Sequence, residues 1–355
     1  MGNRVRKGFR KARRYMAPTI YDVAKKASVS IATVSKVINN TGRISEPTRV
    51  KVLEAMKQLD YRPSVVASAL TRKKTDTLGL LVPDISNPFF SEIARNIEDR
   101  AHERGLSVII CSTDYNEEKE KKYIDLLKRK QVDGFIISSG FKNLDLLKSL
   151  MDQNIPVVML ALDNPSINVN VISVDDHRGG YQATAHLLAQ GHENIAYIGE
   201  DVRSSNIRIF GYREAHEDYG VPIDEENIVK IPSTMDDSRE MTKKLLGRPN
   251  PPTAVFAAND LLAIGVIQGA REKGLNVPED LSVVGFDDTI LATITVPMLT
   301  TVAQPITAMG NKIVDVLIEE IGGKKKVKER NLFTPSLIIR GTTGRPHNLP
   351  KPKAN

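Results

Sequence analysis

The chain of 355 residues is long enough for two or three domains, and 41% hydrophobic with 26% charged residues is typical of a globular protein. No run approaches the ~20 apolar residues of a membrane-spanning helix, so we expect no membrane partner. The single cysteine, Cys111, excludes intrachain disulfides. Its apolar neighbours predict a buried side chain, and this low cysteine usage indicates a cytoplasmic protein.

The formal net charge of +7 is distributed unevenly along the chain. Residues 1–75 contain 18 Lys and Arg against 4 Asp and Glu, whereas the remainder is acidic, a pattern typical of a polyanion-binding protein. Residues 1–17 are expected to be a basic, disordered extension, and they lack the apolar segment of a secretion signal. Three interpretations of this extension are open: a phosphate-binding arm, an added leader, or a segment that precedes the real translation start at Met16. We favour the last two because the ordered pattern begins only at Thr19.

Residues 19–39 predict two short helices joined by a tight turn. Thr19 and Ser30 are the expected N-caps, and Val29 should pin the corner between the helices. The second helix has an apolar face at helical spacing, formed by Val34, Val37 and Ile38. Its other face carries short, mixed side chains that suit a DNA major groove, namely Ile31, Ala32, Thr33, Ser35 and Lys36. We interpret this pair as a DNA-binding helix-turn-helix, with an ordinary αα-hairpin as the alternative.

A third helix should begin after Ser45 and close a three-helix domain over residues 18–62. Its predicted apolar stripe is Val50, Leu53, Met56 and Leu59. Residues 63–76 then predict a hinge helix and linker, because the uncharged run at 64–70 is too short to hold a helix without partners. In that interpretation Leu70 is a wedge for a minor-groove step, and a plain interdomain linker is the alternative.

From Leu78 onward, apolar strands alternate with helices, which predicts parallel sheets covered on both faces. A second series of such units is expected to start near Val171, giving two α/β lobes with a ligand between them at the strand ends. Polar and aromatic residues in these positions are the candidate effector contacts: Asp84, Phe89, Phe90, Asp114, Ser139, Asp163, Arg208, Asn259, Asp260, Asp287 and Gln304. For each carboxylate the alternative is a helix cap or a solvated loop acid.

Enzymatic and cofactor motifs are absent from the sequence. It contains no G-x-x-x-x-G-K-[ST], no G-x-G-x-x-G after the first strand and no G-x-S-x-G. The six histidines lack HExxH or CxxC partners, so we expect neither a metal nor a cofactor. The pair Gly179-Gly180 is expected to let a helix pack closely.

Two N-terminal stretches, TIYDVAKKASVSIATVSKVIN and ISEPTRVKVLEAMKQLDYRPSVVASAL, resemble the LacI/GalR family of bacterial transcriptional regulators. The resemblance continues through TLGLLVPDISNPFF, GHENIAYI, PTAVFAANDLLAIG, DLSVVGFDD and LTTVAQP, and covers about residues 19–345. More loosely, the chain is similar to the branch from Gram-positive bacilli that includes catabolite-control and degradation-activator regulators. A protein corepressor is a further candidate partner.

The resemblance implies a role for individual positions. Ile31, Ala32 and Lys36 would read bases, and Ala67 and Leu70 would contact DNA from the hinge. Backbone contact or support would come from Thr19, Tyr21, Ser30, Thr33, Ser35 and Asn39. Phe89, Arg208 and Asp287 match effector-contact positions most directly. The chain departs from many relatives at Ala161, where they carry an aspartate after the fourth strand, and this departure argues against a simple sugar.

The resemblance also implies a periplasmic-binding-protein-like core that the chain crosses more than once. The expected N-terminal lobe is 77–173 plus 305–334, the C-terminal lobe is 174–304 plus 335–345, and 346–355 is a tail without a leucine heptad. We therefore predict a homodimeric repressor of a palindromic DNA operator, controlled by a small-molecule effector such as a sugar, sugar phosphate or other metabolite. The alternatives are a periplasmic-type sugar-binding protein that does not bind DNA and an α/β sugar- or nucleotide-modifying enzyme.

Overall fold

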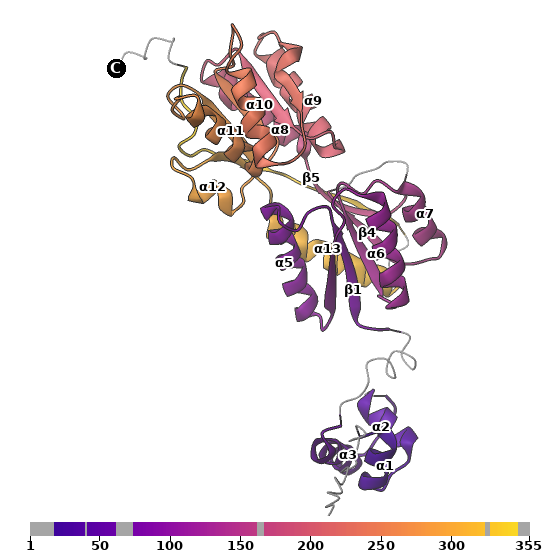
Figure 1. Ribbon diagram of the computed structural model, residues 1–355. Coiled ribbons are helices and arrows are strands. Elements are labelled where there is room, and N and C mark those ends of the chain that lie inside the picture. Colours follow the sequence, from indigo (N-terminus) through magenta and orange to yellow (C-terminus); the bar gives the residue numbers. More distant parts are fainter. Residues whose placement is uncertain (1–17, 40, 62–73, 162–166, 324–326, 347–355) are drawn as a thin grey trace, which may run out of the picture. The chain divides into compact units, whose positions relative to one another are not determined.

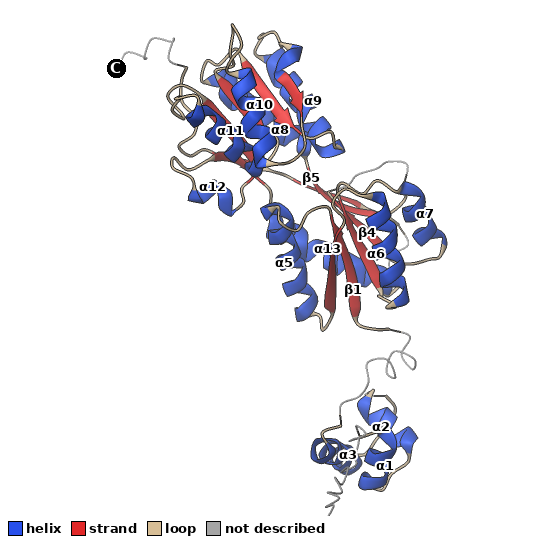
Figure 2. Ribbon diagram, in the orientation of Figure 1, coloured by secondary structure: helices blue, strands red, loops and turns tan. Residues whose placement is uncertain are grey.

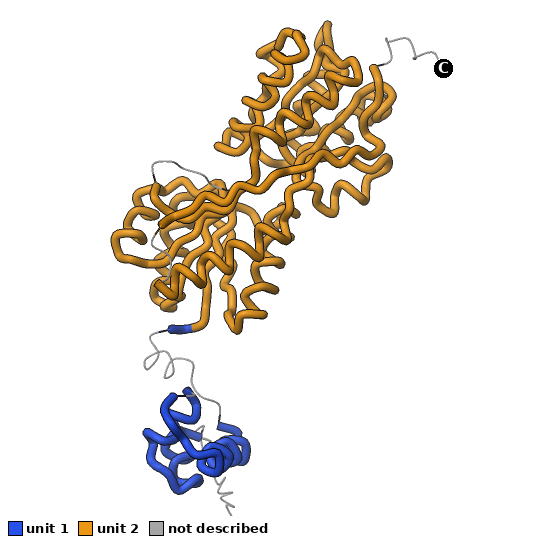
Figure 3. Tube along the Cα trace, turned by 180° about the vertical axis from the view of Figure 1, so that it is seen from behind, with its two compact units in different colours: residues 1–75 blue, residues 76–355 orange. Residues whose placement is uncertain are grey.

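The structure, a computed structural model, describes residues 18–39, 41–61, 74–161, 167–323 and 327–346. The chain divides into two compact units, residues 1–75 and 76–355 (Figure 3), and each is described here by itself. The predictions for residues 1–17, Ala67, Leu70 and Asp163 lie outside the described residues. In the described ranges, no helix is both long and apolar enough to cross a membrane.

The first unit contains three helices, α1 (Ile20–Ala27), α2 (Ile31–Ile38) and α3 (Glu46–Leu59). Thr19 forms a capping box with Asp22 at the start of α1. Ser30 caps α2, and its Oγ accepts a hydrogen bond from the Thr33 N–H at 3.1 Å. Both helix starts therefore agree with the prediction.

Apolar side chains from all three helices form the core of the first unit. Val23, Val34 and Val52 are fully buried, and Val29 packs at the edge of this cluster. The predicted stripe on α3 is wrong in part, because Val50 and Leu53 are 45% and 50% exposed. The face that packs inward is instead Val52, Ala55, Met56 and Leu59. Residues at i, i+3, i+4 and i+7 lie on one face of a helix. Residues at every third position, as in the predicted stripe, do not stay on one face.

The second unit contains two six-stranded sheets, each covered by helices on both faces (Figures 1 and 2). The first sheet has the strand order β11 (Arg330–Phe333), β5 (Asn170–Val174), β4 (Val157–Leu160), β3 (Gly134–Ser138), β1 (Thr77–Val82) and β2 (Ser107–Ser112). Alternate residues of its strands face opposite ways: Leu80 packs in the cluster of α5 (Pro88–Glu103) and α13 (Ile306–Ile321), and Leu81 in that of α6 (Glu117–Arg129) and α7 (Leu144–Asp152).

The second sheet has the order β12 (Ser336–Ile338), β10 (Thr300–Ala303), β9 (Ser282–Asp287), β8 (Ala254–Ala257), β6 (Ile195–Gly199) and β7 (Ile228–Lys230). All its pairings are parallel except that of β10 with β12. Its helices are α8 (Asp176–Ala189), α9 (Arg203–Asp218), α10 (Met235–Leu245), α11 (Asp260–Glu272) and the short α12 (Ile290–Ile294). The mainly parallel two-lobed architecture predicted from the strand and helix pattern is confirmed.

The chain passes between the two sheets three times. The passages follow β5, β10 and β11, so α13 and β11 return to the first sheet before β12 joins the second. The prediction that a second series starts near Val171 is wrong, because β5 pairs with β4 in the first sheet. Apolar periodicity distinguishes strands from helices but does not report which sheet a strand joins.

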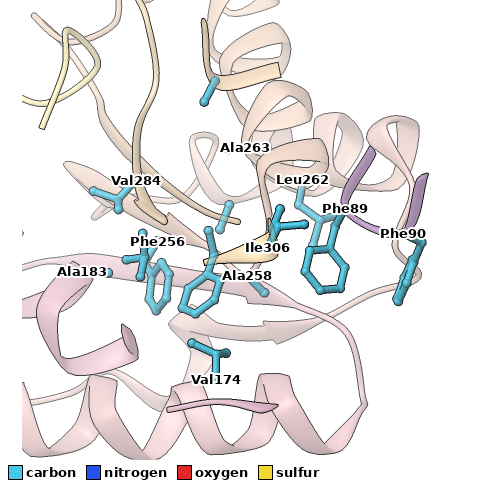
Figure 4. Close-up of a cluster of buried hydrophobic side chains, with 14 of the residues drawn as sticks. Phe89, Phe90, Val174, Ala183, Phe256, Ala258, Leu262, Ala263, Val284 and Ile306 are labelled. Atoms are coloured by element: carbon cyan, nitrogen blue, oxygen red, sulfur yellow. The ribbon is translucent and has the colours of Figure 1, made fainter. Parts of the chain in front are cut away.

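Gly180 in α8 and Gly211 in α9 allow the two helices to pack closely. Close helix packing was the role predicted for the Gly179-Gly180 pair. A Cβ at Gly180 would lie 2.2 Å from the carbonyl oxygen of Arg208, and one at Gly211 would lie 2.0 Å from that of His177. The neighbouring hydrophobic cluster extends from Phe256 and Val284 in the second sheet to Phe89 and Phe90 at the start of α5 (Figure 4). The close approach of the two helix backbones fixes α9, which carries Arg208, against α8.

Candidate functional site

Within the described part of the chain, the outward face of α2 exposes its side chains. Ile31, Ala32 and Lys36 are exposed, whereas Val34 and Val37 on the opposite face are buried. The stem of Lys36 passes beside Gly42, whose ideal Cβ would lie 3.5 Å from the lysine Cδ. A mixed apolar and cationic surface is therefore presented by a helix that the core anchors.

Several residues expected to support DNA contact are engaged within the helix pair. The Thr19 and Ser30 side chains take part in the two caps, and the Asn39 Nδ2 donates to the Ser35 Oγ at 3.2 Å. Tyr21 is different, because its side chain is 66% exposed on α1. The caps and the Ser35–Asn39 bond fix the ends of α2, while Tyr21 remains available to a partner.

A cavity lies between the two lobes at the carboxyl ends of their strands. Its volume is about 40 Å³, and it is lined by Asn87, Phe89, Phe90, Tyr115, Ser139, Gly140, Ala161, Val174, Asp176, Glu200, Val202, Ser204, Arg208, Asn259, Asp287 and Gln304. We call this the central cavity. Both lobes contribute residues to it, as expected for a ligand site at the switch between two α/β units.

Arg208 is the buried cation of the central cavity, with only 8% of its surface exposed. Its Nε and Nη2 each lie 2.8 Å from the Asp176 Oδ1, and its Nη1 donates to the Ala258 carbonyl. The guanidinium also stacks on Phe286, with Cζ 3.6 Å from the ring centroid. Burial raises the pKa of Asp176, while the adjacent guanidinium opposes that rise. These contacts hold the Arg208 guanidinium in one orientation.

Asp287 and Gln304 form a second buried polar pair. The Gln304 Nε2 donates to the Asp287 Oδ1 at 2.7 Å, and Asp287 adopts a positive φ of 112° at the end of β9. Burial raises the pKa of Asp287 well above its usual range against the opposing effect of Arg208. The Gln304 Oε1 is buried, and the described residues offer it no hydrogen-bond partner. A ligand hydroxyl would satisfy that oxygen.

Asn259 and the two phenylalanines complete the cavity wall. The Asn259 Oδ1 caps α11, and its Nδ2 donates to the Ser233 Oγ at 3.0 Å and the Glu200 Oε1 at 3.3 Å. Phe89 and Phe90 meet edge to face, with their ring centroids 5.1 Å apart. This wall combines an aromatic surface with fixed donors and acceptors.

The structure brings seven of the predicted effector residues to the central cavity: Phe89, Phe90, Ser139, Arg208, Asn259, Asp287 and Gln304. Asp84 and Asp114 do not line it. Asp84 accepts hydrogen bonds from the N–H and hydroxyl of Ser86, and Asp114 pairs with Lys119. These two carboxylates correspond to the alternative interpretation, a loop or surface acid.

Asp260 is also a correction. Its carboxylate is buried below the cavity, where it accepts hydrogen bonds from the Thr289 N–H, the Thr289 hydroxyl and the Thr301 hydroxyl at 2.7, 2.9 and 2.6 Å. Burial raises its pKa to about 7 although these donors oppose the rise. Because its oxygens bond to the β9–α12 loop and β10, Asp260 joins these elements and does not face the cavity.

Tyr115, Asp176 and Glu200 line the cavity but were missed by the sequence analysis. Glu200 follows β6 directly and Asp176 is the second residue after β5, so the strand-end rule that selected Asn259 also applied to them. Tyr115 lies one residue beyond the second-strand candidate Asp114. Ala161 lines the wall with a positive φ of 50°, and no carboxylate is present there. Among the described residues, no group of three His, Cys, Asp or Glu side chains is placed to hold a metal ion.

Two family models match the chain. Residues 19–64 match the bacterial regulatory proteins of the lacI family, and residues 184–343 match a periplasmic binding protein-like domain. The HTH-type transcriptional regulator DegA of Bacillus subtilis (strain 168) is 48% identical over 334 residues, covering 92% of this chain and 98% of that protein.

Solved structures resemble the whole chain as well. The lac repressor dimer bound to operator and the anti-inducer ONPF superposes with a TM-score of 0.83 and 30% identity, covering 93% of this chain and all of that one. A transcriptional regulator CelR–cellobiose complex has a TM-score of 0.70 and 30% identity, covering 92% of this chain and 99% of that one. These similarities confirm the family resemblance drawn from the sequence motifs.

Proposed function

The chain belongs to the lacI family of bacterial regulatory proteins, and on that premise we propose how this member recognises DNA and its effector. It is a DNA-binding transcriptional regulator with an effector-binding domain of the periplasmic-binding-protein type, and not an enzyme. We propose that it acts in the cytoplasm as a repressor that binds a palindromic operator. Residues 18–62 would contact DNA, 63–76 would form the hinge, and the two lobes would bind the effector.

The exposed face of α2 carries the proposal for DNA recognition. Lys36 can donate to guanine O6 and N7, whereas Ile31 and Ala32 offer only apolar contact to a thymine methyl. Each half-site is therefore read by few contacts, and a symmetric dimer would be needed to reach useful affinity. The lac repressor is a dimer on its operator in the solved structure.

Replacing Lys36 by alanine is expected to relax the sequence preference by about 1–3 kcal/mol, because one specific donor is lost. The measurement is fluorescence anisotropy with the palindromic duplex selected by the wild type and with a scrambled duplex, at fixed salt. Lys51→Ala on α3 is the control, since it removes an equal charge away from the α2 face. Equal weakening on both duplexes in Lys36→Ala would place base recognition elsewhere.

The polarity of the central cavity supports a neutral, hydroxyl-rich effector. Three carboxylates, those of Asp176, Glu200 and Asp287, line it with a single cation, Arg208, which already bonds Asp176. A phosphate would find the Arg208 guanidinium already bonded to Asp176, whereas a hydroxyl group can both donate to the carboxyl groups and accept from the guanidinium. The CelR relative is a cellobiose complex, which supports a carbohydrate.

The proposed dimer has a candidate surface on the second lobe. Large apolar side chains are exposed on α12 and the segment after it: Ile290, Ile294, Val296 and Met298, with exposures of 58%, 63%, 84% and 54%. Several large apolar side chains exposed along one short segment are typical of an interaction surface. A second copy of the chain is the occupant we propose, because the similar lac repressor structure is a dimer.

Ile294→Asp is expected to convert the protein to a monomer, because a carboxylate would be buried without a partner in the apolar interface. Sedimentation velocity would report the mass, and Val327→Asp, at a residue that is 74% exposed outside the patch, is the control that should stay dimeric. A dimeric Ile294→Asp variant would refute this interface. A stable tetramer of the wild type would refute the proposed homodimer.

Linkage between the lobes and the DNA-binding unit is the proposed mechanism. The proposed effector contacts Phe89 and Ser139 on one lobe and Arg208 and Asp287 on the other. Its affinity must therefore depend on the angle between the lobes. The lobes also meet where the Glu92 Oε1 of α5 accepts from the Ile290 N–H of α12 at 2.9 Å. A change in lobe angle would thus act on α12, on the dimer surface and, through it, on the spacing of the two hinges.

A further inference from the structure

Asp260 is a buried side chain to which the effector site gives no role. It is the first residue of α11, only 1% of its surface is exposed, and the preceding Asn259 lines the central cavity. Among the described residues its hydrogen-bond donors are all neutral: the Thr289 N–H, the Thr289 hydroxyl and the Thr301 hydroxyl. Burial beside neutral partners disfavours an ionised carboxyl group, and such buried acids are candidates for a functional role.

Gly285 in β9 makes room for this carboxyl group. An ideal Cβ at Gly285 would lie 2.6 Å from the Asp260 Oδ1 and 3.3 Å from the Thr301 Oγ1. A side chain at that position would therefore displace the carboxyl group from β9. Because Asp287 is the last residue of the same strand, Asp260 packs against the strand that presents Asp287 to the central cavity.

The two oxygens of Asp260 bind different elements. Oδ1 accepts from the Thr301 hydroxyl of β10 at 2.6 Å, and Oδ2 accepts from the N–H and the hydroxyl of Thr289 at 2.7 and 2.9 Å. Thr289 is the N-cap of α12. A carboxylate accepts on both oxygens, whereas an asparagine amide has a single acceptor oxygen. The complete set of three bonds therefore requires the carboxylate.

The turn between β9 and α12 is strained. Asp287 and Asp288 have positive φ angles of 112° and 58°, a conformation that L-residues rarely adopt. Such a conformation persists only where surrounding contacts impose it. The Arg340 guanidinium pairs with Asp288 at 2.6 Å within the turn, and Asp260 holds Thr289 directly after it. The direction in which α12 leaves β9 thus depends on Asp260.

Helix α12 connects this turn with the first lobe and with the proposed dimer surface. It packs against α11 in the second lobe (Figure 1). The Ile290 N–H, directly after the N-cap, donates to the Glu92 Oε1 of α5 at 2.9 Å. Ile290 and Ile294 carry exposed apolar side chains of the dimer surface. A displacement of the end of β9 can therefore reach the first lobe and the dimer surface through the start of α12.

We propose that Asp260 is a positioning residue, which links the effector contact Asp287 to the start of α12 and thereby couples the cleft to the dimer surface. This inference rests on the proposed effector function of the cleft and adds the residue through which the cleft acts. Asp260 does not face the central cavity, so loss of its bonds should leave effector and operator binding in place and remove the coupling between them. A residue with only a structural role would lower stability without changing the response of the folded protein to the effector.

The test compares operator binding by the full-length protein with and without a saturating sugar. The probes are glucose, ribose and cellobiose, and the one that gives the largest thermal shift is used. Anisotropy is measured at about pH 8, because burial raises the pKa of Asp260 to about 7 and the carboxylate predominates above that value. The ratio of the two operator dissociation constants is the coupling factor, and about 5- to 150-fold is expected for the wild type.

Asp260→Asn and Thr301→Val should each lower the coupling factor at least threefold, while both variants still bind the sugar and the operator. Valine has nearly the shape of threonine, so Thr301→Val carries the test if Asp260→Asn does not fold. A coupling factor within twofold of the wild type in every folded variant of this pair would overturn the inference.

Asp280→Asn is the matched control. It makes the same chemical change in the turn after α11, where the Asp280 Oδ2 accepts from the Asn276 N–H at 2.8 Å. The wild-type coupling factor should remain in this variant. A loss as large as that in Asp260→Asn would mean that the response does not run through the Asp260 bonds, and would also overturn the inference.

Hydrogen exchange measured by mass spectrometry tests whether the effect reaches α12. Sugar binding should change the exchange of amides 290–294 in the wild type, and this change should be absent in Asp260→Asn and in Thr301→Val. An equal response of α12 in the wild type and in both variants would contradict the proposed link.

Failure of the inference can be distinguished from failure of the proposed function. A wild type whose operator affinity responds to none of the three sugars would overturn the proposed sugar control and the inference with it. A wild type that responds, together with variants that respond equally, would retain control from the cleft and reject only the role of Asp260.

Discussion

Arg208→Ala is expected to lower the free energy of unfolding of the second unit by about 3–5 kcal/mol, because it leaves the buried Asp176 carboxylate without its partner. The substitution also removes the hydrogen bond to Ala258 and the stacking on Phe286. Urea unfolding followed by circular dichroism measures this loss. The same variant should show no thermal shift with any sugar that stabilises the wild type.

Arg213→Ala is the matched control on the same helix. Arg213 bonds Glu225 at the surface, and exposed pairs of this kind contribute little, so the unfolding midpoint should barely change. If Arg208→Ala lowered the free energy of unfolding as little as the control does, the buried Asp176 carboxylate would not need the Arg208 guanidinium as its partner. The description of a preorganised cation in the central cavity would then be wrong.

Gly180→Ala is expected to lower the free energy of unfolding by about 1–3 kcal/mol and to weaken effector binding as well. The added Cβ would lie 2.2 Å from the backbone oxygen of Arg208, and neither helix can yield without moving the other. Because the obstructing atom belongs to Arg208, the relief of this clash displaces the residue that the cavity uses. Urea unfolding and calorimetry with a bound sugar measure the two effects separately.

Gly247→Ala provides the comparison for that substitution. Its Cβ would lie 3.4 and 3.5 Å from the nearest carbonyl oxygens, which is an ordinary contact, so its stability should change by no more than about 0.5 kcal/mol. Unaltered stability in Gly180→Ala would show that α8 and α9 are not packed as closely as described. Altered stability with unaltered sugar affinity would separate helix packing from the placement of Arg208.

Local signals explain which elements were predictable from the sequence. The caps at Thr19 and Ser30 and the apolar spacing of α2 are encoded within a few residues, so the helix pair was predicted closely. Helix α9 begins at Arg203 after Val202, which provides no capping side chain, so no local signal marks this helix start in the sequence. The membership of β5 in the first sheet depends on pairing with a distant strand, which a local pattern does not reveal.

The cavity residues also divide into those that a local signal indicates and those that depend on the three-dimensional structure. Parallel strands bring their carboxyl ends together, and that rule placed Asp287 and Gln304 near one site, while the family resemblance also indicated Arg208. The rule does not report where a side chain points, so it also selected Asp260, which is directed into the β9–α12 loop. The role of Tyr115 depends on its packing against Gly140, a contact between loops of different strands. Orientation of this kind requires the three-dimensional structure.

Binding of the palindromic operator with and without a sugar tests the central claim most directly. The wild-type dimer would be titrated by anisotropy against its selected duplex, with and without a saturating concentration of the sugar that produces the largest thermal shift. Allosteric coupling of 1–3 kcal/mol predicts an operator affinity that changes by about 5- to 150-fold, and the operator should change the sugar affinity by the same factor. An operator affinity that stays within twofold at saturating sugar would contradict control of DNA binding from the cleft.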